Sequence, residues 1–171
     1  MFSSAKLSAA ALALCLALST SATSAAAPAG ASMRFVDVER APRRLAELSG
    51  QPAVLVFCRS DCGPCLVELR GLADIEAAAS PAPVVTIALE DRAAASRALR
   101  KMGVQPRHSW FSETPSRDVL LAFNTPPPRL PLAVALAPDG TICARRIGLL
   151  GTDRVRTWAA QCGGKEKEAT L

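Results

Sequence analysis

The strongest constraint on the fold of this chain is an apolar run, Ala53–Cys58, that is soon followed by the motif Cys62-Gly63-Pro64-Cys65. The run lacks the alternation of a half-exposed strand, which is typical of a strand buried on both faces of a parallel sheet. Pro64 suits the first turn of a helix, where its missing N–H costs no hydrogen bond. The sequence therefore predicts a central strand, a short loop and a helix that begins at the two cysteines.

This placement gives the first cysteine of the motif a special electrostatic environment. The first turn of a helix offers unpaired N–H groups and a positive dipole end, and both stabilise a thiolate. In C-x-x-C motifs the pKa of such a thiol falls from about 8.5 to roughly 3.5 to 7.5. Cys62 is therefore the candidate nucleophile and Cys65 the candidate resolving thiol of a dithiol–disulfide exchange. This chemistry needs no metal and no cofactor other than the redox-active Cys62–Cys65 pair.

The rest of the chain alternates between strand and helix patterns. Asp91 is placed to cap a helix that stops at Gly103, and Pro138-Asp139-Gly140 predicts a hairpin turn. Residues 103–115 are expected to be looser. The expected strands are 33–38, 53–58, 84–89, 132–137 and 141–147, and the expected helices 42–48, 63–79, 92–102, 116–123 and 153–162. This order predicts an α/β fold, a three-layer α/β/α sandwich with a mixed central sheet, in one domain over Met33–Cys162.

The first residues, 1–26, have the pattern of a secretory signal peptide. Lys6 precedes the apolar stretch Leu7–Leu18, and small residues follow as far as Ala26. The apolar stretch is shorter than the roughly 20 residues of a membrane-spanning helix. We therefore expect cleavage after Ala26 and a periplasmic or secreted protein. At the other end, residues 163–171 are expected to form a disordered tail.

The six cysteines of the chain fall into distinct groups. Cys15 lies in the expected signal peptide, and the C-x-x-C cysteines form one natural pair. Cys143 and Cys162 are the candidate second disulfide, because disulfides persist outside the cytosol. Closing that loop of about 20 residues contributes roughly 3 kcal/mol to stability. Cys58 is left over, and its apolar strand suits a small buried side chain.

The charge pattern does not favour nucleic-acid binding. The net charge is +5, but the arginines are scattered along the chain and there is no tyrosine. A nucleic-acid surface combines clustered cations with stacking aromatic rings. We therefore expect no nucleic-acid partner.

The whole pattern resembles the thioredoxin superfamily, and the expected export resembles its TlpA/ResA-like branch of periplasmic thiol–disulfide oxidoreductases. The resemblance rests on the strand, the C-G-P-C helix, the following βα unit, a proline before a hairpin and a last helix, and it covers Met33–Cys162. Leu130-Pro131 matches the cis-proline segment of the family, which faces the C-G-P-C loop. The resemblance implies that the substrate is bound by Gly63, Pro64, Leu130 and Pro131.

A second implied site residue is Glu68, which matches a glutamate that lies near the active-site thiols in that branch. The buried acid of thioredoxin falls on Val56 here, so Glu68 is the nearby acid in the sequence that could accept the Cys65 proton. A solvated helix residue is the alternative interpretation. Arg70 replaces the helix-kinking proline of the family, and Asp61 stands where tryptophan is usual.

Asp61 precedes the candidate nucleophile directly, and its charge opposes a thiolate there. At about 7 Å and an effective dielectric constant of about 40, this repulsion is roughly 1 kcal/mol. Arg59 is close enough in sequence to offset it. We therefore expect a Cys62 that is activated, though less than in the commonest forms of the motif.

Two other functions are possible on the same scaffold. The cysteine spacing that begins at Cys58, together with the single histidine His108, resembles the ligand set of Sco-type copper proteins. A peroxiredoxin-like thiol peroxidase would need a hydroxyl residue three positions before Cys62, where Arg59 stands, and a guanidinium that Arg129 could supply. Both patterns are incomplete.

The resemblance implies an exported thiol–disulfide oxidoreductase that reduces disulfides, since the Gly-Pro dipeptide of the motif resembles that of reducing members. A reductant outside the cytosol needs electrons. The implied partners are a membrane thiol-transfer protein as electron donor and a disulfide-containing exported protein, such as an apocytochrome, as substrate. The non-enzymatic alternative is a redox-inert binding module that uses the groove beside Pro131.

Overall fold

The structure is a computed structural model that describes residues 30 and 32–163. Its strands are β1 (Phe35–Asp37), β2 (Pro42–Arg43), β3 (Ala53–Cys58), β4 (Val84–Ala88), β5 (His108–Ser112), β6 (Leu132–Leu136) and β7 (Ile142–Ile147). Across the described residues they form one seven-stranded sheet in the order β2-β1-β5-β4-β3-β6-β7. β3, β4 and β5 run parallel, and all other pairings are antiparallel. The expected mixed sheet is confirmed.

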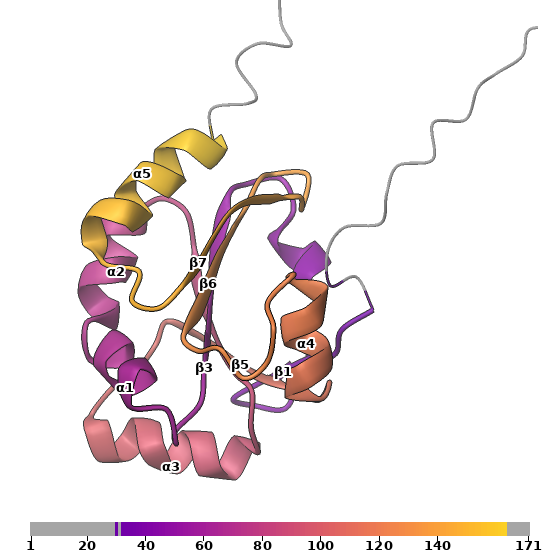
Figure 1. Ribbon diagram of the computed structural model, residues 1–171, viewed down its shortest axis with the longest axis vertical. Helices are drawn as coiled ribbons and strands as arrows, with labels where there is room; N and C mark the ends of the chain where they lie inside the picture. The colour runs from indigo at the N-terminus through magenta and orange to yellow at the C-terminus, as the bar shows by residue number, and fades with distance from the viewer. Residues whose placement is uncertain (1–29, 31, 164–171) are drawn as a thin grey trace, which may run out of the picture.

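Helices cover both faces of this sheet. They are α1 (Gly63–Arg70), α2 (Leu72–Ala79), α3 (Arg92–Met102), α4 (Ser116–Ala122) and α5 (Thr152–Gly163), with a 3₁₀ turn over Leu45–Leu48. α1, α2 and α5 lie on one side of the sheet and α4 on the other (Figure 1). The three-layer α/β/α architecture is therefore confirmed.

β3 joins the two hydrophobic cores, because its six residues are all buried and alternate between the faces of the sheet. Leu55 and Phe57 point into the core beneath α4, where the Phe57 ring lies 4.9 Å from that of Phe123, centroid to centroid. Val56 and Cys58 point into the other core, beneath α1, α2 and α5. The strand that leads to the C-G-P-C motif is thus fixed from both sides.

Two segments differ from the sequence-based expectation near the edge of the sheet. Residues 103–115 were expected to be loose, but β5 forms there and pairs with both β4 and β1. Its sequence has only two buried side chains, Trp110 and Phe111, so the strand depends on its neighbours. Residues 42–48 were expected to be a helix. They form β2 and the 3₁₀ turn instead, because Arg43 binds the Asp37 carboxylate of β1 at 2.7 Å.

The expected helix 63–79 is two helices, because the chain departs from helical geometry at Gly71 (φ −88°, ψ 6°). The Gly71 N–H is shared between the carbonyls of Glu68 at 3.1 Å and Val67 at 3.4 Å. Glycine holds helical dihedral angles weakly, which makes it a natural point for the change of direction. The break falls one residue after Arg70, the position of the family's kinking proline.

The expected termini of α3 and the hairpin are confirmed. The Asp91 carboxylate accepts hydrogen bonds from the N–H groups of Ala93 and Ala94, and Gly103 ends the helix in the left-handed region at φ 68°. β6 and β7 pair across the Pro138-Asp139-Gly140 turn.

The expected signal peptide and, apart from Gly163, the expected tail lie outside the described residues. No helix in the described part of the chain has the length and apolar character to span a membrane.

A disulfide joins Cys143 of β7 to Cys162 of α5, with 5.8 Å between their Cα atoms. The two cysteines are 19 positions apart. β7 is the edge strand on this side of the sheet, so the bond fastens the last helix to the last strand. It lies away from the C-x-x-C motif in sequence and belongs to the framework that supports the site.

Replacing both Cys143 and Cys162 by serine should lower the free energy of unfolding by about 3 kcal/mol, because the unfolded chain regains the freedom of that loop. Urea unfolding under oxidising conditions measures this difference. In strong reductant the variant and the unmodified protein should have the same stability. Equal stability under oxidising conditions would show that the bond does not constrain the chain.

Candidate active site at the start of helix α1

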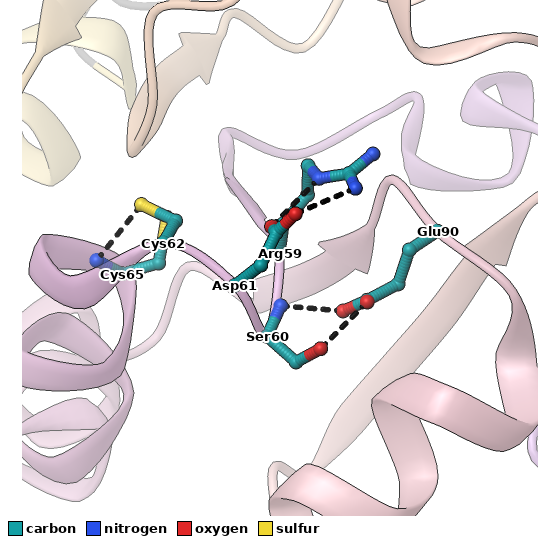
Figure 2. The surroundings of a disulfide bond; sticks show 6 residues. All are labelled: Arg59, Ser60, Asp61, Cys62, Cys65 and Glu90. Carbon is teal, nitrogen blue, oxygen red and sulfur yellow. Dashed lines mark hydrogen bonds and ion pairs between the residues drawn. A yellow bond between two sulfur atoms is a disulfide. The ribbon is translucent and has the colours of Figure 1, made fainter.

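The C-x-x-C motif lies where β3 has ended and α1 begins. Cys62 is the residue that caps α1, and its Sγ accepts a hydrogen bond from the Cys65 N–H at 3.2 Å (Figure 2). A disulfide joins the two, with 5.2 Å between their Cα atoms. Cys65 is completely buried and Cys62 partly exposed, which is what dithiol exchange requires of a resolving and an attacking thiol. Gly63 and Pro64 are exposed in the first turn.

The loop before Cys62 is held by Glu90, which lies just after the end of β4. The Glu90 carboxylate accepts hydrogen bonds from both the N–H and the Oγ of Ser60, at 2.5 and 2.6 Å (Figure 2). Sequence analysis missed Glu90, although the pairing of Cys58 with Ala88 in parallel strands places residues 60 and 90 at the same edge of the sheet. The clamp fixes the direction from which the chain enters α1.

Asp61 is paired with Arg59, as the sequence suggested. Two guanidinium nitrogens of Arg59 donate to the two carboxylate oxygens of Asp61, each at 2.9 Å (Figure 2). These hydrogen bonds lower the pKa of Asp61, so its carboxylate remains charged. A third nitrogen of Arg59 donates to the carbonyl of Leu89 at 3.2 Å and holds the side chain in place. The negative charge beside Cys62 is therefore matched by a positive one.

Glu68 is a buried carboxyl group, only 4% exposed, so it is not the solvated helix residue of the alternative interpretation. Both of its oxygens accept the N–H of Leu150, at 3.0 and 3.1 Å, from the segment between β7 and α5. Burial raises the pKa of Glu68, partly opposed by this hydrogen bond and by the charge of Arg146. Glu68 follows Cys65 by three residues, which places both on the same side of α1.

Cys58 is a free thiol in the core, 3% exposed, at the end of β3. Burial and the nearby negative charges of Glu68 and Glu90 raise its pKa far above the usual range. The side chain therefore stays a neutral thiol and is unsuited to act as a nucleophile or as a thiolate ligand. The neighbouring Val56 is buried in the same core, so the buried acid of thioredoxin has no counterpart there.

The single histidine of the copper-binding alternative does not lie near the cysteines. His108 lies at the first position of β5, exposed, and its pairing with Val85 places it at the opposite end of the sheet from Cys62. Within the described residues, no three His, Cys, Asp or Glu side chains are placed to hold a metal ion. Arg59, at the position of the peroxidase hydroxyl residue, is engaged by Asp61.

Leu130 and Pro131 lie beside the end of β3. Leu132, the first residue of β6, pairs with Phe57, so the two preceding residues lie level with the loop that leads to Cys62. The Leu130–Pro131 peptide bond is cis. Pro131 is buried and its carbonyl accepts the N–H of Gly148 at 2.8 Å, while Leu130 is partly exposed. Leu130 is thus the member of this pair that a bound partner could touch.

A hollow of about 390 Å³ opens at this point, and we name it the Cys62 groove. It runs between the loop before α1 and the segment that includes α4 and the prolines after it. One wall contains Arg59, Asp61 and Cys62, and the other contains Arg117, Leu120 and Leu130. The nucleophile candidate therefore has an adjoining surface on which a partner chain could lie.

Replacing Asp61 by asparagine should raise the rate of Cys62 alkylation in the reduced protein at neutral pH about two- to fivefold, because a charge that opposes the thiolate is removed. Replacing Arg59 by alanine should lower the rate by a similar factor, since Asp61 is then uncompensated. The alkylation rate of the double variant should lie near that of the unmodified protein. Rates that do not respond to either change would show that the pair has no influence on Cys62.

Replacing Glu68 by glutamine should change how stability depends on pH. The Glu68 pKa is raised from about 4.5, so the folded protein favours the protonated acid and loses stability as pH rises through that raised value. Glutamine keeps an oxygen for the Leu150 N–H but does not ionise. Measured in the oxidised protein, the variant should therefore gain stability relative to the unmodified protein between pH 4 and neutral pH. If the stabilities of the variant and of the unmodified protein changed with pH in the same way, this expectation would be contradicted.

Comparison with known proteins gives matches at the level of structure. Neither a protein-family model nor a curated protein matches the chain. DsbF from Mycobacterium tuberculosis matches with a TM-score of 0.65 and 18% identity, over 79% of this chain and 98% of that one. StoA from Bacillus subtilis matches with a TM-score of 0.59 and 18% identity, over 77% and 98%.

A third solved structure, a secreted M. tuberculosis disulfide oxidoreductase homologous to E. coli DsbE, matches with a TM-score of 0.57 and 25% identity, over 74% of this chain and 93% of that one. These matches extend over nearly the whole of each solved chain, and they support the resemblance found in the sequence. The chain therefore has a thioredoxin-like fold.

Proposed function

We propose that the protein is a thiol–disulfide oxidoreductase that reduces disulfides of exported proteins. The observation that carries this proposal is the pair formed by a partly exposed Cys62 at the start of α1 and a completely buried Cys65 in its first turn. The Cys62 groove gives a partner chain a place beside the exposed sulfur.

The proposed reaction begins with the reduced protein. The Cys62 thiolate attacks one sulfur of the partner disulfide, a mixed disulfide forms, and the other partner sulfur leaves as a thiolate that takes up a proton. Cys65 then loses its proton and attacks the Cys62 sulfur. This step forms the Cys62–Cys65 bond, the state in the structure, and releases the second partner thiol. Two electrons pass from the protein to its partner.

Glu68 is the group that we assign to the proton of Cys65. It lies on the same side of α1, is buried, and has a pKa raised by burial, which brings it nearer to the range that a proton acceptor needs. Its carboxylate is held by the Leu150 N–H and does not rely on solvent for its position. Val56, at the thioredoxin acid position, offers no alternative acceptor.

Export and the electron donor belong to the same proposal. The signal-peptide pattern of residues 1–26 supports export, and one of the matching structures is described as secreted. A reductant outside the cytosol is oxidised in each turnover, so it needs a membrane thiol-transfer protein to reduce the Cys62–Cys65 bond again.

The direction of electron flow is tested by the reduction potential of the Cys62–Cys65 pair. A reductant should have a potential nearer to the roughly −270 mV of thioredoxin than to the roughly −120 mV of a strong oxidant. Equilibration with glutathione or dithiothreitol buffers, followed by thiol trapping and mass spectrometry, measures it. A value close to that of the strong oxidants would reverse the proposed direction.

Replacing Cys65 by serine should trap the mixed disulfide, because the resolving thiol is gone. With a disulfide-containing protein such as insulin, the variant should accumulate a covalent complex through Cys62 that reductant releases. Replacing Cys62 by serine should remove reduction of insulin and form no complex. Cys58→Ala is the matched control and should keep both reactions, since its thiol is buried and unpaired. An active Cys62→Ser variant would overturn the proposal.

A further inference from the structure

The Cys62 groove has an uneven distribution of charge. Its apolar lining comes from Leu120 and Leu130 together with two prolines, Pro127 and Pro128. Of the charged residues that line it, Arg59 and Asp61 bind each other, so their charges offset one another. The remaining charged residue that lines the groove is Arg117.

Arg117 is free to bind a partner. It is exposed in the first turn of α4, and no residue of the described chain forms a hydrogen bond or ion pair with its side chain. Asp118 is next in sequence but lies about 100° further round the helix and does not line the groove. Arg129, between two lining residues, is likewise exposed and without such a contact to the described residues. The groove thus carries an excess of positive charge beside apolar lining residues.

We infer that the Cys62 groove selects partner segments in which an acidic side chain lies close to the disulfide cysteine, and that Arg117 is a residue that determines this specificity. The inference rests on the proposed function. The hollow of about 390 Å³ falls within the range of roughly 300 to 1,000 Å³ that is usual for ligand sites. An extended segment would place apolar atoms against Leu120 and Leu130 and its carboxylate near the Arg117 guanidinium.

The expected effect is mainly on the rate of encounter. Complementary charges steer association, and salt weakens the effect because exposed charges are screened over about 10 Å at 0.1 M ionic strength. Arg117 is exposed and not part of the reacting sulfur chemistry, so its contribution should appear as a preference among partners. Cys62 remains the group that attacks in every case.

The test uses three peptides of the same length, each with one cysteine bound to 2-thiopyridine in a mixed disulfide. They differ in the two residues that flank the cysteine, which are glutamate, glutamine or lysine. Release of the neutral thiopyridone reports the rate at which the reduced protein attacks. The glutamate peptide should react about fivefold faster than the lysine peptide at low salt, and the preference should shrink at high salt.

Arg117→Glu should invert the order of the glutamate and lysine peptides. Arg154→Glu is the matched control, because Arg154 is an exposed arginine of α5, on the opposite side of the sheet from α4, and it should keep the original order. Thermal unfolding verifies that both variants fold.

Three results would overturn the inference while leaving the proposed function intact. These are equal rates for the three peptides, an unchanged preference in Arg117→Glu, or the same inversion in Arg154→Glu, which would reflect overall charge. If the reduced, folded protein attacked none of the peptides, the proposed function itself would fail.

Discussion

The burial of β3 on both of its faces is the constraint on which the active site depends. A strand whose side chains are all enclosed cannot shift along its neighbours without moving apolar groups into water or into collisions. Its last residue, Cys58, therefore has a fixed position, and only Arg59, Ser60 and Asp61 separate it from Cys62, the residue that caps α1. The Glu90 carboxylate also fixes the chain beyond the end of the strand, because it binds Ser60 where strand pairing has ended. Cys62 is thus positioned by the core and by the hydrogen bonds between Glu90 and Ser60.

A second set of contacts reaches the site from the far end of the chain. The N–H that holds Glu68 belongs to Leu150, in the segment between β7 and α5. The Cys143–Cys162 disulfide fastens those two elements to each other. The framework disulfide and the proposed proton acceptor are therefore connected through a short stretch of backbone. Through this arrangement, the Glu68 carboxyl group on α1 binds a backbone N–H near the end of the described chain.

Much of the fold and of the candidate site could be predicted from the sequence, because the local sequence patterns are strong. The apolar run of β3, the capped α3, the hairpin turn and the C-x-x-C helix start each have a local physical cause, and each lies where expected. β5 was missed because its two buried aromatic residues, Trp110 and Phe111, show no strand pattern until β4 and β1 lie beside them. The break at Gly71 was missed because the apolar spacing continues across it. Glu90 and the Leu150 N–H depend on tertiary contacts, and of these only Glu90 could have been found, from the register of two adjacent parallel strands.

The burial of Cys58 has a consequence for the oxidative maturation of a protein like this one. An unpaired thiol near a reactive pair can exchange with it and form a non-native disulfide, which an isomerase then has to rearrange. Once the core has closed, Cys58 is both inaccessible and locked in its protonated form, so it cannot enter that competition. In the folded protein, the apolar strand therefore keeps the third sulfur away from thiols and oxidants in the solvent.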